Sequence, residues 1–380
     1  MAETSPSGMV SLPVRCGKVL NRCDDATGGA AREVTARTDY LRRGTILRLS
    51  CKAGIAMKAI VYRKYGPPDV LKLEEVPKPT PGDNEVLIKV HAAAVNPLDW
   101  HFMRGVPGFL RLFAGLSRPK RTRLGVDMAG EVESAGAAVN GLKAGDRVFG
   151  AVDGAFAEYV CAPVSAVALL PNNMAFEQGA AVPIAGLTAL QALRDRAKLQ
   201  PGQTVLINGA AGGVGTFAVQ ISKWMGAKVT GVCSTRNVAL VREIGADEVV
   251  DYTREDFITR DECYDVIFDL VGNRTLPAFR RVLSPRGSFI ACGGGGPETP
   301  VSHLLAGMIK PLVLGWFTRQ RLLGIMAKRS KEDLATLSEL MGSGRVSPVI
   351  DRKFGLSEVA EAIRYQEQGH ARGKVVISLE

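Results

Sequence analysis

The stretch Leu206–Gly215, "LINGAAGGVG", limits what this chain can fold into more than any other part of it. The residues before it, Thr204–Asn208, form a short apolar run typical of a buried strand, and Val214–Met225 after it is typical of an amphipathic helix. A strand, a glycine-rich turn and a helix in this order predict a parallel βαβ unit. Such a turn holds the pyrophosphate of a dinucleotide at the helix N-terminus.

The turn departs from the usual G-x-G-x-x-G pattern, because Ala210 stands where the first glycine is expected. Gly212 would let the main chain approach the pyrophosphate, and Gly215 would let the helix pack closely against the strand. The same glycines could also be ordinary turn and helix-start residues. We expect the whole turn to bind the cofactor, through Asn208, Gly209, Ala210, Ala211, Gly212, Gly213, Val214 and Gly215.

Strand and helix patterns alternate along the rest of this region and predict a doubly wound parallel sheet in an α/β fold. The expected strands are Lys228–Cys233, Glu248–Asp251, Asp265–Asp269 and Ser288–Cys292, and the expected helices are Phe176–Arg194, Val238–Ile244 and Pro277–Leu283. Before it, strand patterns separated by Gly and Pro turns predict an antiparallel β-rich domain, with strands at 57–62, 85–95, 128–132, 146–149 and 156–161. After it, we expect helices at Lys331–Met341 and Ser357–Glu367 and a strand at Lys374–Leu379.

The strand after the glycine turn ends in "CSTRN", Cys233–Asn237, where a dinucleotide-binding fold reads the ribose. No acid stands there to bond the ribose 2′-hydroxyl. Ser234, Thr235 and Arg236 suit a 2′-phosphate instead, so NADPH is the predicted cofactor. The two hydroxyls could equally cap the helix that follows. Tyr252 would lie against the adenine or the phosphate, or would simply pack.

Two further segments follow later strands of the predicted sheet and so fall on its carboxyl edge, where ligands bind. They contribute Val271 and Gly272, and then Cys292, Gly293 and Gly294, to the expected cofactor site. We expect Cys292 to be structural.

Charge and apolar patterning exclude two broad functions. Residues 1–56 hold nine basic and five acidic residues and so supply +4 of the net charge of +10. We expect this tail to be a disordered extension or a misassigned start. The basic cluster Arg118–Arg123 has no interleaved aromatic residues, so nucleic acid is not an expected partner. No apolar run reaches the length of an integral membrane span, and scattered cysteines favour a reducing, cytoplasmic setting.

Eight motifs occur in the order of a known family: "MKAIVY", "GDNEVLIKVHAAAVNPLDW", "GVDMAGEVESAG", "GLKAGDRVFG", "GLTALQAL", "GQTVLINGAAGGVG", "GADEVVDY" and "GKVVI". The chain from residue 57 to its end resembles the medium-chain dehydrogenase/reductase superfamily, in its zinc-free quinone oxidoreductase branch. The resemblance implies a discontinuous GroES-like catalytic domain, 57–181 and 316–380, with a Rossmann NADP(H)-binding domain, 182–315, inserted in it.

The resemblance also implies that no metal is bound. Where zinc-dependent members carry a cysteine and a Gly-His-Glu motif, this chain has Asn96 and Gly125-Val126-Asp127. Too few zinc ligands remain for a site. His101 lies near the first of these positions, and we expect it in a loop.

Hydride transfer from NADPH to a quinone or an α,β-unsaturated carbonyl is the implied reaction, since it needs only a hydrogen-bond donor at the developing oxyanion. We expect the Asn96 amide to be that donor and Asp99 to orient its loop. The family places Thr188 beside the nicotinamide. Lys374 would reach cofactor or substrate, or would be a solvated lysine at a strand edge.

The expected partner is a small hydrophobic electrophilic substrate. Two apolar segments, Val106–Leu116 and His303–Phe317, would favour the bulkier members of this class. They could equally be core or the contact of a homodimer. Other readings are an enoyl-thioester or carbonyl reductase of the same fold, or a non-catalytic NADPH-binding or membrane-associated protein. An S-adenosylmethionine-binding domain fits less well, because a β-rich domain precedes the turn.

Overall fold

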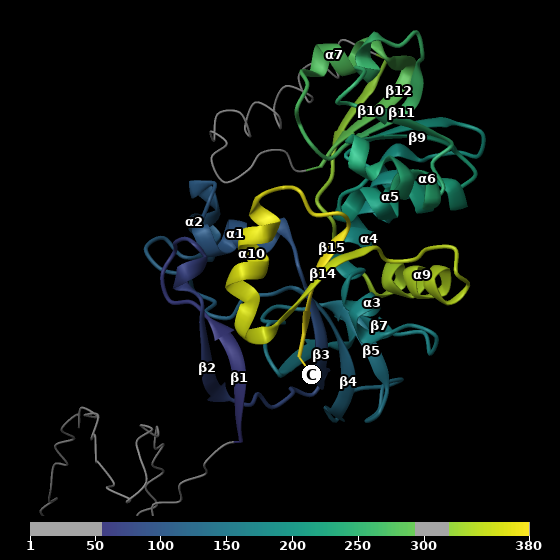
Figure 1. The fold of residues 1–380 in the computed structure, drawn as a ribbon. Coiled ribbons are helices and arrows are strands. Elements are labelled where there is room, and N and C mark those ends of the chain that lie inside the picture. The colour runs from purple at the N-terminus through teal and green to yellow at the C-terminus, as the bar shows by residue number, and fades with distance from the viewer. Residues whose placement is uncertain (1–54, 293–318, 380) are drawn as a thin grey trace, which may run out of the picture. The chain divides into compact units, whose positions relative to one another are not determined.

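The computed structural model describes residues 55–292 and 319–379 of the chain (Figure 1). Almost all of the predicted tail lies outside the described residues, as do Gly293, Gly294 and the segment His303–Phe317. The described residues from Ala56 onward belong to one compact unit, which contains two large sheets.

The first sheet is parallel throughout and carries the glycine turn. Its strands run in the order β10-β9-β8-β11-β12-β13, so the chain reverses direction across the sheet between β8 and β11. The strands are β8 (Thr204–Asn208), β9 (Lys228–Cys233), β10 (Glu248–Asp251), β11 (Tyr264–Asp269), β12 (Leu283–Ala291) and β13 (Arg321–Gly324), and the helices between them are α5 (Gly213–Trp224), α6 (Val238–Glu243) and α7 (Leu276–Arg281). This parallel strand order confirms the expected Rossmann architecture. Ligands of such sheets bind at the switch point, here between β8 and β11.

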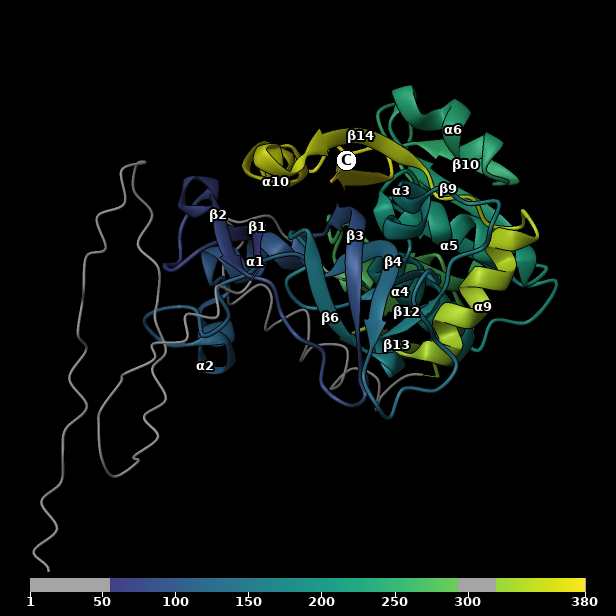
Figure 2. The same cartoon turned by 90° about the horizontal axis from the view of Figure 1, so that it is seen from below.

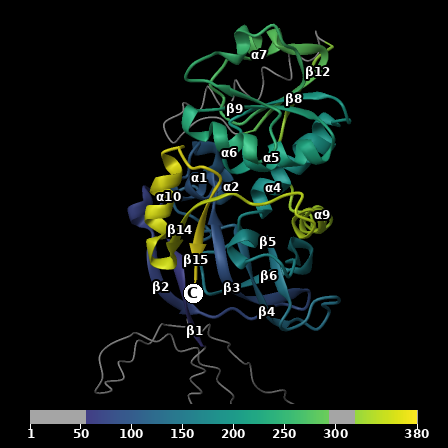
Figure 3. The same ribbon diagram turned by 45° about the vertical axis from the view of Figure 1, so that its right-hand side comes forward.

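The second sheet combines strands from both ends of the described chain. Its order is β14-β15-β3-β4-β5-β7, with β6 also paired to β3. Figure 2 shows β6, β3 and β4 next to one another. The strands are β3 (Glu85–Val95), β4 (Asp127–Ala135), β5 (Arg147–Ala151), β6 (Tyr159–Pro163), β7 (Val167–Leu169), β14 (Ile350–Gly355) and β15 (Lys374–Ser378). The antiparallel pairing of β15 with β3 is visible in Figure 3, and it brings the end of the chain back to the β-rich domain. A smaller antiparallel pair, β1 (Ala56–Val61) and β2 (Lys72–Pro77), stands apart from this sheet.

Strand β13 lies close to the domain boundary that we expect at residue 316. It pairs with β12 at the edge of the parallel sheet, so Arg321–Gly324 belongs to that sheet although it follows this position in the chain. The boundary itself stays a prediction. The segment Arg321–Gly324 is short and carries no strong strand pattern, which is why the sequence did not indicate it.

Three helix predictions needed correction. The single helix expected over Phe176–Arg194 is divided into α3 (Phe176–Ala180), α4 (Pro183–Leu190) and a π-helical turn that follows. Pro183 starts α4 because its missing N–H suits the first turn of a helix. Leu283 was expected to end a helix, but it begins β12. His101 lies in α1 (Pro97–Arg104), where we had expected a loop.

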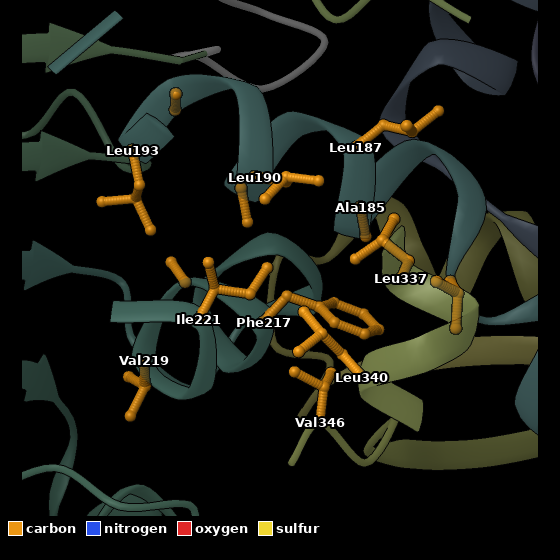
Figure 4. Close-up of a cluster of buried hydrophobic side chains, with 14 of the residues drawn as sticks. Ala185, Leu187, Leu190, Leu193, Phe217, Val219, Ile221, Leu337, Leu340 and Val346 are labelled. Atoms are coloured by element: carbon orange, nitrogen blue, oxygen red, sulfur yellow. The ribbon is translucent and has the colours of Figure 1, made fainter. Parts of the chain in front are cut away.

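A hydrophobic core between α4, α5 and α9 (Lys331–Gly342) fixes α5, the helix after the glycine turn, to the rest of the protein (Figure 4). Leu187 and Leu190 of α4, Phe217 of α5, and Leu337 and Leu340 of α9 are all buried in it. Burial of each such side chain contributes about 1.5–3 kcal/mol. The packing therefore gives α5, and the turn that precedes it, a fixed position next to α4.

Candidate active site

The glycine turn is tight, and its backbone packs closely against the neighbouring strand. Gly209 has a positive φ of 91°, and its N–H and that of Ala210 both donate to the carbonyl of Val232. A Cβ on Gly215 would lie 2.1 Å from the carbonyl oxygen of Gly209, so only glycine fits there. A Cβ on Gly212 would meet nothing closer than 3.4 Å. Gly215 is thus required for packing, whereas Gly212 leaves open a side from which a ligand can approach.

Ala210 is accommodated by a glycine on the neighbouring strand. Its side chain is completely buried, and a Cβ on Gly231 of β9 would come within 3.0 Å of its methyl group. The missing side chain of Gly231 therefore makes room for the methyl group that replaces the first glycine of the pattern. The sequence did not indicate this compensation, because the two positions are 21 residues apart and only the sheet brings them together.

The end of β9 presents the residues expected at the ribose. The Thr235 hydroxyl donates to Oδ2 of Asp251 at 2.6 Å, and Arg236 donates through Nη2 to the carbonyl of His370 at 2.7 Å. Ser234 occupies the N-cap of the following 3₁₀ turn without a side-chain capping bond, and its hydroxyl accepts from Nδ2 of Asn237 at 3.3 Å. Tyr252 is 54% exposed and so is not a core residue. The carboxylate of Asp251, the residue before Tyr252, was not expected so close to Thr235.

The carboxyl edge of the sheet is organised by Asp269, at the end of β11. Its Oδ1 accepts hydrogen bonds from Asn208 Nδ2 and from the N–H groups of Val271 and Gly272. Asp269 thereby holds three expected cofactor residues beside the glycine turn. Burial raises the pKa of the Cys292 thiol to about 11, which fits the structural role expected for it.

A buried polar cluster lies where the catalytic domain meets the glycine turn. Nζ of Lys374 donates to Oδ1 of Asn96 at 2.6 Å and lies 3.2 Å from Oδ2 of Asp127. Nδ2 of Asn96 donates to the same Asp127 oxygen at 2.9 Å. Each of the three residues is at most 3% exposed. Lys374 is therefore not the solvated strand-edge lysine that the sequence left open.

Lys374 also lies against the cofactor turn. The N–H of the preceding Gly373 donates to the carbonyl of Ala211 at 2.9 Å. A Cβ on Gly213 would be 3.2 Å from Cδ of Lys374. The side chain of Lys374 thus runs from the first residue of α5 to Asn96, and so from the cofactor turn to the catalytic domain.

Asp99 is the fourth member of the cluster. Its Oδ2 accepts the N–H of Asn96 at 2.7 Å, as in a capping box at the start of α1, so it does orient the Asn96 backbone. Its Oδ1 is buried and has no hydrogen-bond partner among the described residues. Burial raises the pKa of Asp99 to about 7, and the nearby charge of Asp127 acts in the same direction.

Asp127 is the residue that sequence reasoning missed. Its Oδ1 accepts the N–H of Ile184 at 3.0 Å, at the start of α4, and its Oδ2 serves Asn96 and Lys374. Thr188 follows one turn later on α4, and its hydroxyl donates to the carbonyl of Ile184 at 2.6 Å. The available signal was the position of Asp127 in the motif Gly125-Val126-Asp127, which differs from the zinc-binding motif at the same place in the chain.

Within residues 55–292 and 319–379, no group of three or more His, Cys, Asp or Glu side chains is arranged to hold a metal ion. His101 lies outside the cluster: its Nδ1 is 2.8 Å from the carbonyl of Val106, and burial lowers its pKa. In the same part of the chain, none of the helices has both the length and the apolarity for crossing a membrane.

Comparison with known proteins identifies relatives along most of the chain. Residues 82–172 match the family described as alcohol dehydrogenase GroES-like domain, and residues 244–377 match the one described as zinc-binding dehydrogenase. A 2-methylene-furan-3-one reductase of Solanum lycopersicum and an NADPH-dependent alkenal/one oxidoreductase of Arabidopsis thaliana are each 35% identical, over 84% of this chain and 79% of theirs. The structure of a quinone oxidoreductase from Coxiella burnetii, 33% identical, matches 86% of this chain and all of that one with a TM-score of 0.74.

Proposed function

This chain belongs to the medium-chain dehydrogenase/reductase superfamily, among its quinone oxidoreductases and enone reductases, and on that premise we propose that it transfers a hydride from NADPH to a quinone or an α,β-unsaturated carbonyl. The observation that carries the proposal is the path of Lys374. Its side chain runs from Gly213 in the glycine turn to the buried Asn96–Asp127 pair, so an ammonium lies close to the turn that would hold the cofactor.

The proposed cofactor site extends along the carboxyl edge of the parallel sheet. The turn from Asn208 to Gly215 would hold the pyrophosphate, since the N–H groups in the first turn of α5 have no acceptor within the helix. Ser234, Thr235, Arg236 and Tyr252 would surround the 2′-phosphate. Of the five N–H donors of Arg236, only one is engaged by His370, which leaves the guanidinium able to bind a phosphate. When bound, NADPH supplies the hydride.

The side chains of Val126 and Asp127 do not fit a zinc ion. Val126 has no ligand atom, and the Asp127 carboxylate already accepts hydrogen bonds from Ile184, Asn96 and Lys374. A cation is present at this point in the form of the Lys374 ammonium. Reduction of an already electrophilic carbon suits such a site, because the negative charge that develops on oxygen needs a donor and not a Lewis acid.

The substrate side would favour hydrophobic molecules. Four large side chains of the segment Val106–Leu116 are exposed: Phe109, Leu112, Phe113 and Leu116. Either an apolar substrate or a second copy of the chain, as in a homodimer, would cover them. The thiols of the four described cysteines are free, which supports a reducing compartment such as the cytoplasm.

The test is an assay of purified protein with NADPH or NADH and a panel of quinones, enones, enoyl thioesters and simple ketones. Loss of nicotinamide absorbance with quinones or enones is the expected result, with NADPH preferred. Faster turnover of enoyl thioesters or of simple ketones would favour the alternative reductases of the same fold. Binding of NADPH without any turnover would favour a non-catalytic role.

A further inference from the structure

The donors in the buried cluster are unequally occupied. Nδ2 of Asn96 has two hydrogens, and both are used, by Oδ2 of Asp127 and by the carbonyl of Ala94 at 3.3 Å. Nζ of Lys374 has three hydrogens, and among residues 55–292 and 319–379 it has two partners, Asn96 and Asp127. The side-chain amide expected to bind the substrate oxygen is therefore committed within the protein, whereas the ammonium retains one donor.

We propose that Lys374 donates the hydrogen bond, and then the proton, to the substrate oxygen, and that Asp127 is the positioning residue that aims the Lys374 ammonium. This inference rests on the proposed function and deepens it. Asn96 then also acts as a positioning residue, because its Oδ1 accepts from Lys374 while its Nδ2 is bound to Asp127.

Two partners, Asn96 and Asp127, hold the Lys374 ammonium, and the backbone next to it is tied to the glycine turn. Asp127 connects it to β4 and, through the N–H of Ile184, to the start of α4. Gly373 connects the backbone of Lys374 to Ala211 in the cofactor turn. The Lys374 ammonium is nearly excluded from solvent, so its attraction to the Asp127 carboxylate compensates for the free energy lost on dehydration. A donor held in this way needs no rearrangement when charge develops on the substrate oxygen.

Enone reduction at this site moves one hydride and one proton to the substrate. The hydride leaves NADPH and forms a C–H bond at the β-carbon, so the nicotinamide is oxidised and the substrate is reduced. The electrons of the C=C bond move toward the carbonyl, which leaves an enolate oxygen. One N–H bond of Lys374 breaks as the enolate O–H bond forms, and the resulting enol converts to the saturated carbonyl. The neutral amine regains its proton from water after product release.

Quinones and enones depend on this proton to different degrees. Hydride addition to a quinone gives an aromatic hydroquinone anion, a phenolate with a conjugate acid of pKa near 10 as in tyrosine. The enolate from an enone is a much stronger base. Loss of the proton donor should therefore slow enone reduction more than quinone reduction, whereas a general distortion of the site should slow both alike.

The experiment compares four single variants in the full chain: Lys374→Met, Lys374→Arg, Asp127→Asn and, as a control, Lys353→Met on the exposed surface of β14. For each, kcat is measured with one enone and one quinone, in H₂O and in D₂O, and NADPH affinity is measured by fluorescence titration. The double variant Lys374→Met/Asp127→Asn removes both charges together, so it retains no unpaired buried charge if a single variant fails to fold.

For Lys374→Met and for the double variant we expect a loss in enone kcat of about 10²–10⁴-fold, the range of a general acid, with at least a tenfold smaller loss for the quinone. Lys374→Arg should keep the charge but not the proton transfer, because arginine does not deprotonate in proteins. It should therefore lose the solvent isotope effect and most of the enone activity. Asp127→Asn should reduce enone kcat with NADPH affinity within a few-fold of wild type.

Equal losses for the two substrates, or an active Lys374→Met, would overturn the role of Lys374. Wild-type enone kcat in Asp127→Asn would overturn the positioning role of Asp127. A wild-type protein that binds NADPH but reduces neither substrate would overturn the proposed function itself, and the role of Lys374 with it. An inactive wild type therefore contradicts the proposed function, whereas the ratio of variant to wild-type kcat tests the roles of Lys374 and Asp127 in an active protein.

Discussion

Lys374 and Asp127 form an ion pair across 247 positions of sequence, with Nζ and Oδ2 3.2 Å apart and both side chains withdrawn from solvent. The pair ties the last strand of the chain to β4 in the β-rich domain. Neither charge has another ionic partner among the described side chains within 4.0 Å. Each therefore depends on the other for its place in the interior.

The first prediction concerns the stability of this pair. Removing one partner leaves an uncompensated buried charge, which typically costs about 3–5 kcal/mol. We expect Asp127→Asn or Lys374→Met to lower the free energy of unfolding by this amount in urea titrations. The double variant should recover most of the loss. Additive losses in the double variant would mean that the two charges do not stabilise one another.

The second prediction concerns pH and Asp99. Its carboxyl ordinarily titrates near 3.8, and burial raises the pKa in the folded protein to about 7. Between these values the folded state binds a proton that the unfolded state has lost, so the free energy of unfolding falls as pH rises. The contribution is complete below about pH 3.8 and is lost as pH rises through 7.

Asp99→Asn should remove this contribution while keeping an acceptor for the N–H of Asn96. Urea unfolding at pH 5 and at pH 8 measures the effect. We expect the wild type to be less stable at pH 8 than at pH 5, and the variant to show a smaller difference. An unchanged difference would assign the pH dependence to other groups, among which the buried Asp127 also has a raised pKa.

The third prediction separates two glycines of the turn. Gly215→Ala would place a Cβ 2.1 Å from the Gly209 carbonyl oxygen, so it should destabilise the fold and shift the melting temperature. Gly212→Ala has room within the protein and should melt close to wild type. Its methyl group would instead stand where the pyrophosphate docks, so NADPH affinity should fall at least tenfold by fluorescence titration. A Gly212→Ala protein with wild-type affinity would place the pyrophosphate elsewhere.

The fourth prediction concerns cofactor choice. Arg236→Ala should raise KM for NADPH about tenfold or more and leave KM for NADH nearly unchanged, because only NADPH carries the 2′-phosphate. Arg242→Ala, an exposed arginine on α6, is the matched control and should change neither value. The same KM ratio in Arg236→Ala as in wild type would exclude Arg236 from phosphate recognition.

The sequence allowed the nucleotide-binding half to be predicted well, because its signals are local. Buried strands, glycine turns and helix starts lie within a few residues of one another, so Thr204–Asn208 and Lys228–Cys233 were predicted with their observed bounds. The break before Pro183 and the edge strand Arg321–Gly324 were missed, since tertiary packing decides both. The length of the helix at Pro277 was overestimated because a short apolar run fits helix and strand alike.

The site was predicted less completely, because its contacts are not local. Asn96, Asp99 and Lys374 were expected at the site, and the structure brings all three together with Asp127. Which of them has a donor to spare depends on the other partners of each atom, and no motif encodes this. The exchange of roles between Asn96 and Lys374 followed only from the hydrogen bonds to Asp127 and Ala94.

The most direct test of the central claim is isotope transfer from the cofactor. NADPH labelled with deuterium at C4 is mixed with the protein and an enone that turns over, and the product is analysed by mass spectrometry and NMR. The account predicts one deuterium per product molecule at the β-carbon, with the α-position taking its hydrogen from solvent. A reduced product without deuterium from either face of labelled NADPH, or deuterium found on the carbonyl carbon, would contradict it.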